Sequence, residues 1–319
     1  MRSGLGLLAQ NLRHHTSLLI TGSRANRIVT PVSSGDMIGL PERITLVVFD
    51  LDGVVYRGHE PIRGARELVA ALHLANVEVR FATNNSMVAR AGYVQRLAGM
   101  GIHTTVDEIV TSTSATIQHL RRHAPDVRSV LAVGAEGMET ELSAAGLHVV
   151  MAGDTSMADH DGGRLERAYD AVIVGLDPHV DYRRLAVAMR AVGDGARLVA
   201  TNADARYPTA VGFLPGAGSI VAAIETATGT RAEVIGKPSP AMFTAILEAT
   251  GVPATQAVVI GDNPDADVVG AHRAGCAAIL VLTGVADAAL VETLDGERRP
   301  DAVAEDPAGV LALIEPRLS

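Results

Sequence analysis

The 319-residue sequence contains no tryptophan, four phenylalanines, five tyrosines and a single cysteine, Cys276. One cysteine excludes an intrachain disulfide and fits a reducing compartment, so we expect a cytoplasmic protein. The sequence lacks an uninterrupted apolar run of about 18 residues, which argues against a transmembrane helix. The formal net charge is −9, which disfavours nucleic acid or an anionic membrane as a partner. Plentiful small apolar residues suit tightly packed α/β layers.

The first 42 residues differ from the rest of the chain. They carry basic residues and have no acid before Asp36, which is compatible with a transit-like or secretory segment. The apolar stretch Leu5–Ala9 is short for a secretory signal. We therefore interpret 1–42 as a disordered or wrongly assigned N-terminal extension, with Met37 an alternative start. The basic residues are Arg2, Arg13, Arg24 and Arg27.

From Ile44 onward, short apolar runs alternate with amphipathic stretches. Strands alternating with helices predict an α/β fold with a Rossmann-like, doubly wound parallel-sheet core. A second series of alternating elements occupies the middle of the chain, and we interpret it as an inserted α/β cap. The expected division is a core of residues 43–105 and 206–319 and a cap of residues 106–205. Predicted strands are 44–49, 77–82, 129–133, 169–175, 196–200, 257–260 and 277–282; predicted helices are 63–75, 87–100, 112–123, 136–145, 182–192, 220–228 and 239–250.

Three of the predicted core strands end at polar clusters. The clusters begin at Asp50, Thr83 and Gly261, and the last one contains Asp262. In an open parallel sheet, ligands bind beyond the carboxyl ends of the strands, so neighbouring strands would bring these clusters into one crevice. A single cluster of this kind is usually a turn or a helix cap, but three after buried strands indicate a site.

Carboxylates dominate these clusters. Asp50 and Asp52 lie two residues apart, which places both on one side of an extended backbone. With Asp262 they would repel one another unless a hard cation such as Mg²⁺ lay between them. Thr83 offers a hydroxyl before a predicted helix, where main-chain N–H groups bind anions. Lys237 could neutralise a transferred phosphoryl group.

The order of these motifs resembles that of the haloacid dehalogenase-like phosphatases. The matching segments are Asp50-Leu51-Asp52-Gly53-Val54, Thr83-Asn84-Asn85-Ser86, Gly236-Lys237-Pro238 and Gly261-Asp262-Asn263-Pro264-Asp265-Ala266-Asp267. The run Asp52–Gly58, together with Thr201-Asn202-Ala203-Asp204 and Pro215-Gly216-Ala217-Gly218-Ser219, is similar to the subfamily with an inserted cap of type IIA.

The resemblance implies a mechanism. Asp50 would be the nucleophile that forms an aspartyl-phosphate, and Asp52 would be the general acid and base. Thr83, Asn84 (through backbone N–H groups) and Lys237 would bind the phosphoryl group. Mg²⁺ would be held by Asp50, the main-chain carbonyl of Asp52, and Asp262, supported indirectly by Asp267. Dehalogenases of this superfamily lack the residue equivalent to Asp52, which favours phosphoryl chemistry.

The resemblance leaves the leaving group open. Implied substrates are small phosphate monoesters such as glycerol 3-phosphate or phosphoglycolate; nucleotide monophosphates and pyridoxal phosphate are alternatives. We expect specificity to involve Asp204, Arg206 and Tyr207, where the cap returns to the core. A homodimer formed through the cap is a further implied partner. A phosphomutase or an inactive phosphate sensor would share the motifs. The short stretch after Gly53 disfavours the first, and the intact carboxylates disfavour the second.

Overall fold

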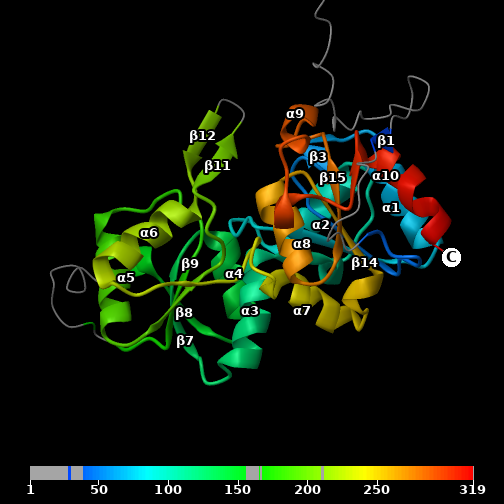
Figure 1. Ribbon diagram of the computed structural model, residues 1–319. Coiled ribbons are helices and arrows are strands. Elements are labelled where there is room, and N and C mark those ends of the chain that lie inside the picture. Colours follow the sequence, from blue (N-terminus) through cyan, green and yellow to red (C-terminus); the bar gives the residue numbers. More distant parts are fainter. Residues whose placement is uncertain (1–27, 30–38, 156–164, 166, 210–211, 319) are drawn as a thin grey trace, which may run out of the picture.

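The computed structural model describes residues 28–29, 39–155, 165, 167–209 and 212–318. Two α/β units lie side by side, and we call them the core and the cap (Figure 1). The described part of the chain runs from the core into the cap and returns to the core. Within the described ranges, no helix is long and apolar enough to cross a bilayer.

The core is built on a seven-stranded sheet. Its order is β1–β16–β15–β14–β2–β5–β6, and all neighbours are parallel except β1 and β16. The central strands are buried along their whole length, as expected for a sheet covered on both faces. The bounds are β1 Ile28–Val29, β2 Leu46–Phe49, β5 Glu78–Thr83, β6 Ile109–Thr111, β14 Ala257–Gly261, β15 Ala277–Val281 and β16 Ala302–Ala304.

Alternation along β2 divides the core into two apolar layers. Val47 and Phe49 pack with α1, α2 and α10, whereas Leu46 and Val48 pack on the side of α7 and α8. A short hairpin, β3 and β4, follows β2. The bounds are α1 Ala65–Leu74, α2 Arg90–Gly99, α7 Ala241–Thr250, α8 Val269–Arg273, α9 Ala288–Val291, α10 Pro307–Ile314, β3 Tyr56–Arg57 and β4 Glu60–Pro61; a π-helical turn, Pro264–Val268, precedes α8.

The cap has its own five-stranded parallel sheet, with the order β13–β10–β9–β7–β8. Helices α3 and α4 pack on the side facing the core, and α5 and α6 pack on the opposite side (Figure 1). A hairpin of β11 and β12 projects from this unit. The bounds are β7 Ser129–Val133, β8 His148–Met151, β9 Ala171–Val174, β10 Arg197–Ala200, β11 Arg206–Thr209, β12 Gly212–Pro215, β13 Glu233–Val234, α3 Ser112–His123, α4 Glu136–Ala144, α5 Tyr182–Gly193 and α6 Ala217–Thr228.

The fold class is confirmed, but the limits of the two sheets differ from the predicted boundaries at 106 and 205. Ile109–Thr111 pairs with β5 and therefore belongs to the core sheet. Glu233–Val234 pairs with Val199–Ala200 in the cap sheet, and α6 packs against the same unit. The chain thus enters the cap after residue 111 and leaves it after residue 234. The prediction missed this because two-residue and three-residue strands carry too little pattern.

Part of the segment 1–42 lies within the described residues. Ile28–Val29 forms an edge strand, paired antiparallel with Val303–Ala304. The main-chain N–H of Gly39 also donates to Asp301 Oδ1 at 2.8 Å. Residues 1–27 and 30–38 lie outside the described residues.

Candidate active site

The three polar clusters meet at one edge of the core sheet. Asp50 follows β2, Thr83 ends β5 and Asp262 follows β14. These strands are adjacent, with β2 in the middle. The predicted crevice beyond their carboxyl ends therefore exists, and the loop after β13 brings Lys237 into it.

Lys237 is buried between carboxylates. Its Nζ donates to Asp50 Oδ1 at 2.5 Å, to Asp267 Oδ1 at 2.7 Å and to the Ala82 carbonyl at 3.2 Å. Burial lowers the pKa of this ammonium, but the charges of Asp267 and Asp50 outweigh burial and raise it above its ordinary value. Lys237 is therefore a fixed cation beside Asp50.

Asp50, Asp262 and Asp267 each place one carboxylate oxygen within 4.8 Å of the others. Burial raises the pKa of Asp50 well above its ordinary value, and burial with the charge of Asp267 raises that of Asp262 to about 7. Burial is the main cause of both shifts, and the charges of neighbouring carboxylates add to it; a hard cation would relieve this repulsion. The donor set therefore fits Mg²⁺, which prefers a few carboxylate oxygens.

The three carboxylates differ in their other contacts. Asp262 Oδ2 accepts from the Val285 N–H at 2.7 Å. Asp267 Oδ1 is bonded to Lys237, and its Oδ2 accepts from the Asn263 N–H at 3.1 Å. Both oxygens of Asp267 are thus engaged by protein donors, as suits the supporting role that we expected for it.

Two glycines let the chain pass close to Asp262. A Cβ at Gly53 would lie 2.3 Å from Asp262 Oδ2, and one at Gly284 would lie 1.7 Å from the same atom. Gly53 also has a φ of 86°, which favours glycine. Side chains at either position would displace the carboxylate.

The Asp52 side chain lies apart from this carboxylate group. It is exposed, and Tyr56 Oη lies 3.5 Å from its Oδ2. The surrounding protein partly desolvates the carboxyl and raises its pKa, whereas Arg96 and the Tyr56 contact lower it. Arg96 lies over the Tyr56 ring, 4.2 Å from its centre, and its Nη1 lies 3.4 Å from Tyr56 Oη. The Asp52 carboxyl thus faces solvent and contacts Tyr56, which is itself held by Arg96.

The sequence did not predict the contacts of Tyr56 and Arg96 near Asp52, nor the closeness of Gly284 to Asp262. Tyr56 stands in the quoted run Asp52–Gly58, but nothing in that run shows that its hydroxyl turns back to Asp52. Arg96 lies 44 residues further along the chain, in α2, and carries no sequence signal of its own.

Thr83 and Asn84 also lie at the site. Thr83 is buried, and its Oγ1 accepts from the Asn85 N–H at 3.2 Å. The side-chain amide of Asn84 is bonded to the main chain of Lys237 and to Asp204. The side chain of Asn84 is therefore committed to protein groups, and any phosphate contact falls to its backbone N–H.

One pocket joins the predicted catalytic and specificity residues. Its walls come from both the core and the cap. Leu176 and Asn202, which the sequence did not single out as binding residues, contribute to the cap side. The lining includes Asp50, Asp52, Thr83, Asn84, Asp204, Arg206 and Tyr207.

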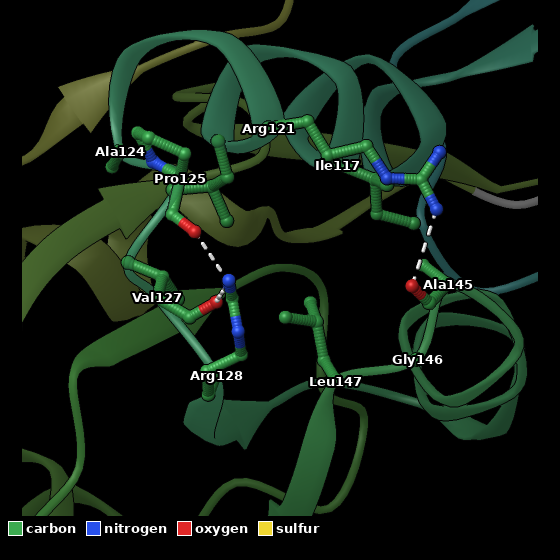
Figure 2. Close-up of a pocket in the computed structure, with 10 residues that line it drawn as sticks. Ile117, Arg121, Ala124, Pro125, Val127, Arg128, Ala145, Gly146 and Leu147 are labelled. Carbon is green, nitrogen blue, oxygen red and sulfur yellow. Dashed lines mark hydrogen bonds between the residues drawn. The ribbon is translucent and has the colours of Figure 1, made fainter.

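A second cavity lies in the cap, among α3, the loop after it and the loop between α4 and β8. Figure 2 shows Arg121 bonded to the Ala145 carbonyl at 3.1 Å and Arg128 bonded to the Val127 carbonyl at 2.9 Å. None of the predicted site residues lines this cavity. Both arginines are already paired with carbonyl groups, so we assign the candidate reaction site to the first pocket.

Two family models match separate segments of the chain. Residues 47–148 match a family described as haloacid dehalogenase-like hydrolase, and residues 234–309 match one described as HAD-hydrolase-like. These ranges contain Asp50, Thr83, Lys237 and Asp262.

Characterised relatives cover most of the chain. An acid sugar phosphatase from Staphylococcus epidermidis is 32% identical over 238 residues, which are 75% of this chain and 86% of the relative. Human chronophin is 37% identical over 246 residues, or 75% of this chain and 81% of chronophin.

Solved structures share the overall fold. A 4-nitrophenylphosphatase from Thermotoga maritima has a TM-score of 0.75 and 31% identity, covering 85% of this chain and 97% of that one. A glycerol phosphate phosphatase from Mycobacterium tuberculosis, solved in complex with magnesium, has a TM-score of 0.74 and 33% identity, covering 85% and 78%.

Proposed function

We propose that this chain, which belongs to the haloacid dehalogenase-like hydrolases, is a Mg²⁺-dependent phosphatase whose nucleophile is Asp50. Within that family it is a phosphoric monoester hydrolase with a cap of type IIA. The observation that carries the proposal is the placement of the Asp50 carboxylate. It lies 2.5 Å from a buried lysine and within one group of three carboxylates. That placement supplies a nucleophile, a fixed cation and a metal site at one point.

Asp50 attacks phosphorus, and the bond between phosphorus and the ester oxygen breaks as the new bond to Asp50 forms. Asp52, protonated, gives its proton to the departing alcohol oxygen. In the second step, Asp52 takes a proton from water as that water attacks the aspartyl-phosphate and releases inorganic phosphate. The exposed position of Asp52 and its raised pKa support both roles.

Lys237 and Thr83 bind the phosphoryl oxygens in this proposal, together with the backbone N–H of Asn84. Asp50, Asp262 and the main-chain carbonyl of Asp52 hold Mg²⁺, and Asp267 orients Lys237. When bound, the ion offsets the charge that builds up on the phosphoryl group.

The direct test is hydrolysis of p-nitrophenyl phosphate with and without Mg²⁺. We expect metal-dependent turnover, and Asp50→Asn should lower kcat by about 10⁴-fold or more because the amide is a poor nucleophile. The matched control is Asp126→Asn, an exposed aspartate in the loop before β7, which should keep full activity. An active Asp50→Asn protein would exclude Asp50 as the nucleophile.

The substrate class in this proposal is a small phosphate monoester, such as glycerol 3-phosphate, phosphoglycolate or a sugar phosphate. Walls from both core and cap surround the reaction site, which supports a small leaving group. The solved neighbour that acts on glycerol phosphate and the relative named for acid sugars point the same way. Nucleotide monophosphates and pyridoxal phosphate belong in the same assay panel, with Arg206→Ala and Tyr207→Phe as the specificity variants.

A further inference from the structure

We infer that Asn84 is a positioning residue, whose side-chain amide ties the main chain of Lys237 to Asp204 of the cap. This inference rests on the proposed role of Lys237 in binding the phosphoryl group. Asn84 directly follows the last residue of β5, so it is anchored at the edge of the core sheet. Lys237 lies just after the point where the chain leaves the cap, and Asp204 lies within the cap, between β10 and β11.

The first observation is the two-sided bond to Lys237. Asn84 Oδ1 accepts from the Lys237 N–H at 2.8 Å, and Asn84 Nδ2 donates to the Lys237 carbonyl at 2.9 Å. This pair of bonds fixes the peptide groups on both sides of the Lys237 Cα. It thereby sets the direction in which the side chain leaves the main chain toward Asp50.

The fit around this pair leaves little space. A Cβ at Gly236 would lie 2.6 Å from Asn84 Oδ1 and 2.4 Å from the Thr201 carbonyl oxygen. Glycine at 236 therefore allows the Lys237 loop to lie against the amide.

The second observation is the remaining donor of Asn84. Nδ2 also donates to Asp204 Oδ2 at 3.0 Å, so both amide protons are engaged. Asp204 is partly buried beside the pocket, and its own N–H donates to Asn202 Oδ1 at 3.1 Å. Asp204, expected as a specificity residue, is thus held on one carboxylate oxygen by the core.

The third observation concerns the main-chain carbonyl of Asn84. It accepts from Ser112 Oγ at 2.8 Å and from Asn202 Nδ2 at 2.7 Å. Ser112 starts the first cap helix, and Asn202 follows the strand β10. One core residue therefore contacts the chain where it enters the cap, in the cap loop after β10, and at the catalytic lysine just after the chain leaves the cap.

The side chain at position 84 must supply one acceptor and two donors. Only an amide of the length of asparagine meets this requirement. Aspartate keeps the acceptor but loses both donors. It would also place a carboxylate against Asp204 and against the Lys237 carbonyl.

The test is a double-mutant cycle on p-nitrophenyl phosphate and glycerol 3-phosphate. Asn84→Asp should lower kcat at least tenfold, and by the same factor for both esters, because Lys237 acts on the phosphoryl group they share. Asp204→Asn alone should cost less than threefold, because its amide oxygen can still accept from Asn84. The combined variant should recover at least threefold over Asn84→Asp, because the amide at 204 now donates to the carboxylate at 84.

The matched control is Asn85→Asp, which adds the same charge one residue away. The Asn85 side chain accepts from the Met87 N–H at 2.8 Å and does not contact Asp204 in the described contacts. Adding Asp204→Asn should not rescue it. The inference would be overturned if the effects of Asn84→Asp and Asp204→Asn on kcat simply multiplied in the combined variant. It would also be overturned, in favour of a general charge effect, if Asp204→Asn rescued Asn85→Asp equally well.

A readout without substrate keeps this inference separate from the proposed function. In Asn84→Ala, hydrogen exchange at the Lys237 N–H should be at least tenfold faster, whereas Asn84→Asp should retain its protection. If Asn84→Asp does not fold, Asp204→Ala replaces it and should raise exchange in the segment containing Lys237. Unchanged exchange in Asn84→Ala would contradict the inference. A wild type without esterase activity would contradict only the proposed function.

Discussion

At the scale of single residues, the position of the Asp262 carboxylate depends on neighbouring residues that have no side chain. The positions that crowd it are glycines from two different loops, after β2 and after β15. Backbone can approach the carboxylate from both sides, and the Val285 N–H orients it. The geometry of the carboxylate that we propose as a metal ligand is here determined by residues that have no functional group.

Gly284→Ala should therefore weaken metal binding. The new methyl group would lie 1.7 Å from Asp262 Oδ2, so the carboxylate must move. We expect the Mg²⁺ concentration for half-maximal activity to rise roughly tenfold, as for other residues that orient a metal ligand. A Mg²⁺ titration of phosphatase activity measures this.

The control is Gly99→Ala at the end of α2, where a Cβ would meet no atom within 4 Å. Its Mg²⁺ dependence should equal that of the wild type. If Gly284→Ala also behaved like the wild type, Asp262 would not be needed for metal binding in its present position.

At the scale of elements, a buried carboxylate joins α4 of the cap to α2 of the core. Glu141 accepts from the Thr111 hydroxyl at 2.7 Å, from the Arg90 N–H at 2.8 Å and from Arg90 Nε at 3.2 Å. Nearby, the Gly137 N–H donates to the Met87 carbonyl at 3.1 Å. The first turn of α2 and the helix α4 are thus held together by buried and partly buried polar contacts.

Glu141→Ala should lower the free energy of unfolding by about 2–4 kcal/mol, because it leaves a buried hydroxyl and a half-buried guanidinium without their acceptor. Chemical denaturation measures the change. Glu139→Ala, in the same helix but exposed, should change stability by less than about 0.5 kcal/mol. Equal effects of the two substitutions would show that the buried contacts contribute nothing.

A second link between elements depends on pH. His272 in α8 has its Nε2 3.0 Å from Asp301 Oδ2, just before β16, and its Nδ1 2.9 Å from the Glu297 carbonyl. The hydrogen bond to Asp301 raises the pKa of His272. Burial alone would raise the pKa of Asp301, but the bond from His272 and two main-chain N–H groups lower it.

The sign of the stability effect follows from these directions. The contribution of His272 is complete below its unfolded pKa of about 6.5 and is lost as the pH rises through the higher folded value. That of Asp301 is present above its unfolded pKa of about 3.9 and is lost as the pH falls through the lower folded value. The pair therefore stabilises the fold most between about pH 4 and pH 6.5.

We expect the stability difference between the wild type and His272→Gln to shrink from pH 6 to pH 9. Denaturation curves at both pH values measure it. His103→Gln, at an exposed histidine, gives the background pH dependence. A difference that stayed constant or grew with pH would contradict the assignment of a charged His272.

At the scale of the whole molecule, the sequence predicts long, regular elements well and short ones poorly. The predicted helix at 112–123 and the predicted strand at 129–133 coincide with α3 and β7, which are long enough for their patterns to be recognised. The strands β6 and β13 have three and two residues and give no such pattern. These two strands define the boundary between core and cap, so the prediction misplaced it.

The same contrast holds for the site. The carboxylates and Lys237 could be predicted because each follows a buried strand or an apolar run, and the sheet brings strand ends together. Tyr56, Arg96 and the contacts of Asn84 could not be predicted, because they depend on where side chains meet after distant segments pack. Asp204 illustrates the limit: the sequence places it near the pocket, but only the fold reveals its bond to Asn84.

The two chain crossings between the units lie against the same residue, Asn84. For protein engineering, this makes Asn84 a shared contact of both junctions if the cap were exchanged by joining new sequence after residue 111 and before residue 235. Such a graft would keep the core sheet intact. To reproduce the contacts of Asn84, the incoming segment must also supply a hydroxyl at the entry and an acid in the loop that replaces the one after β10.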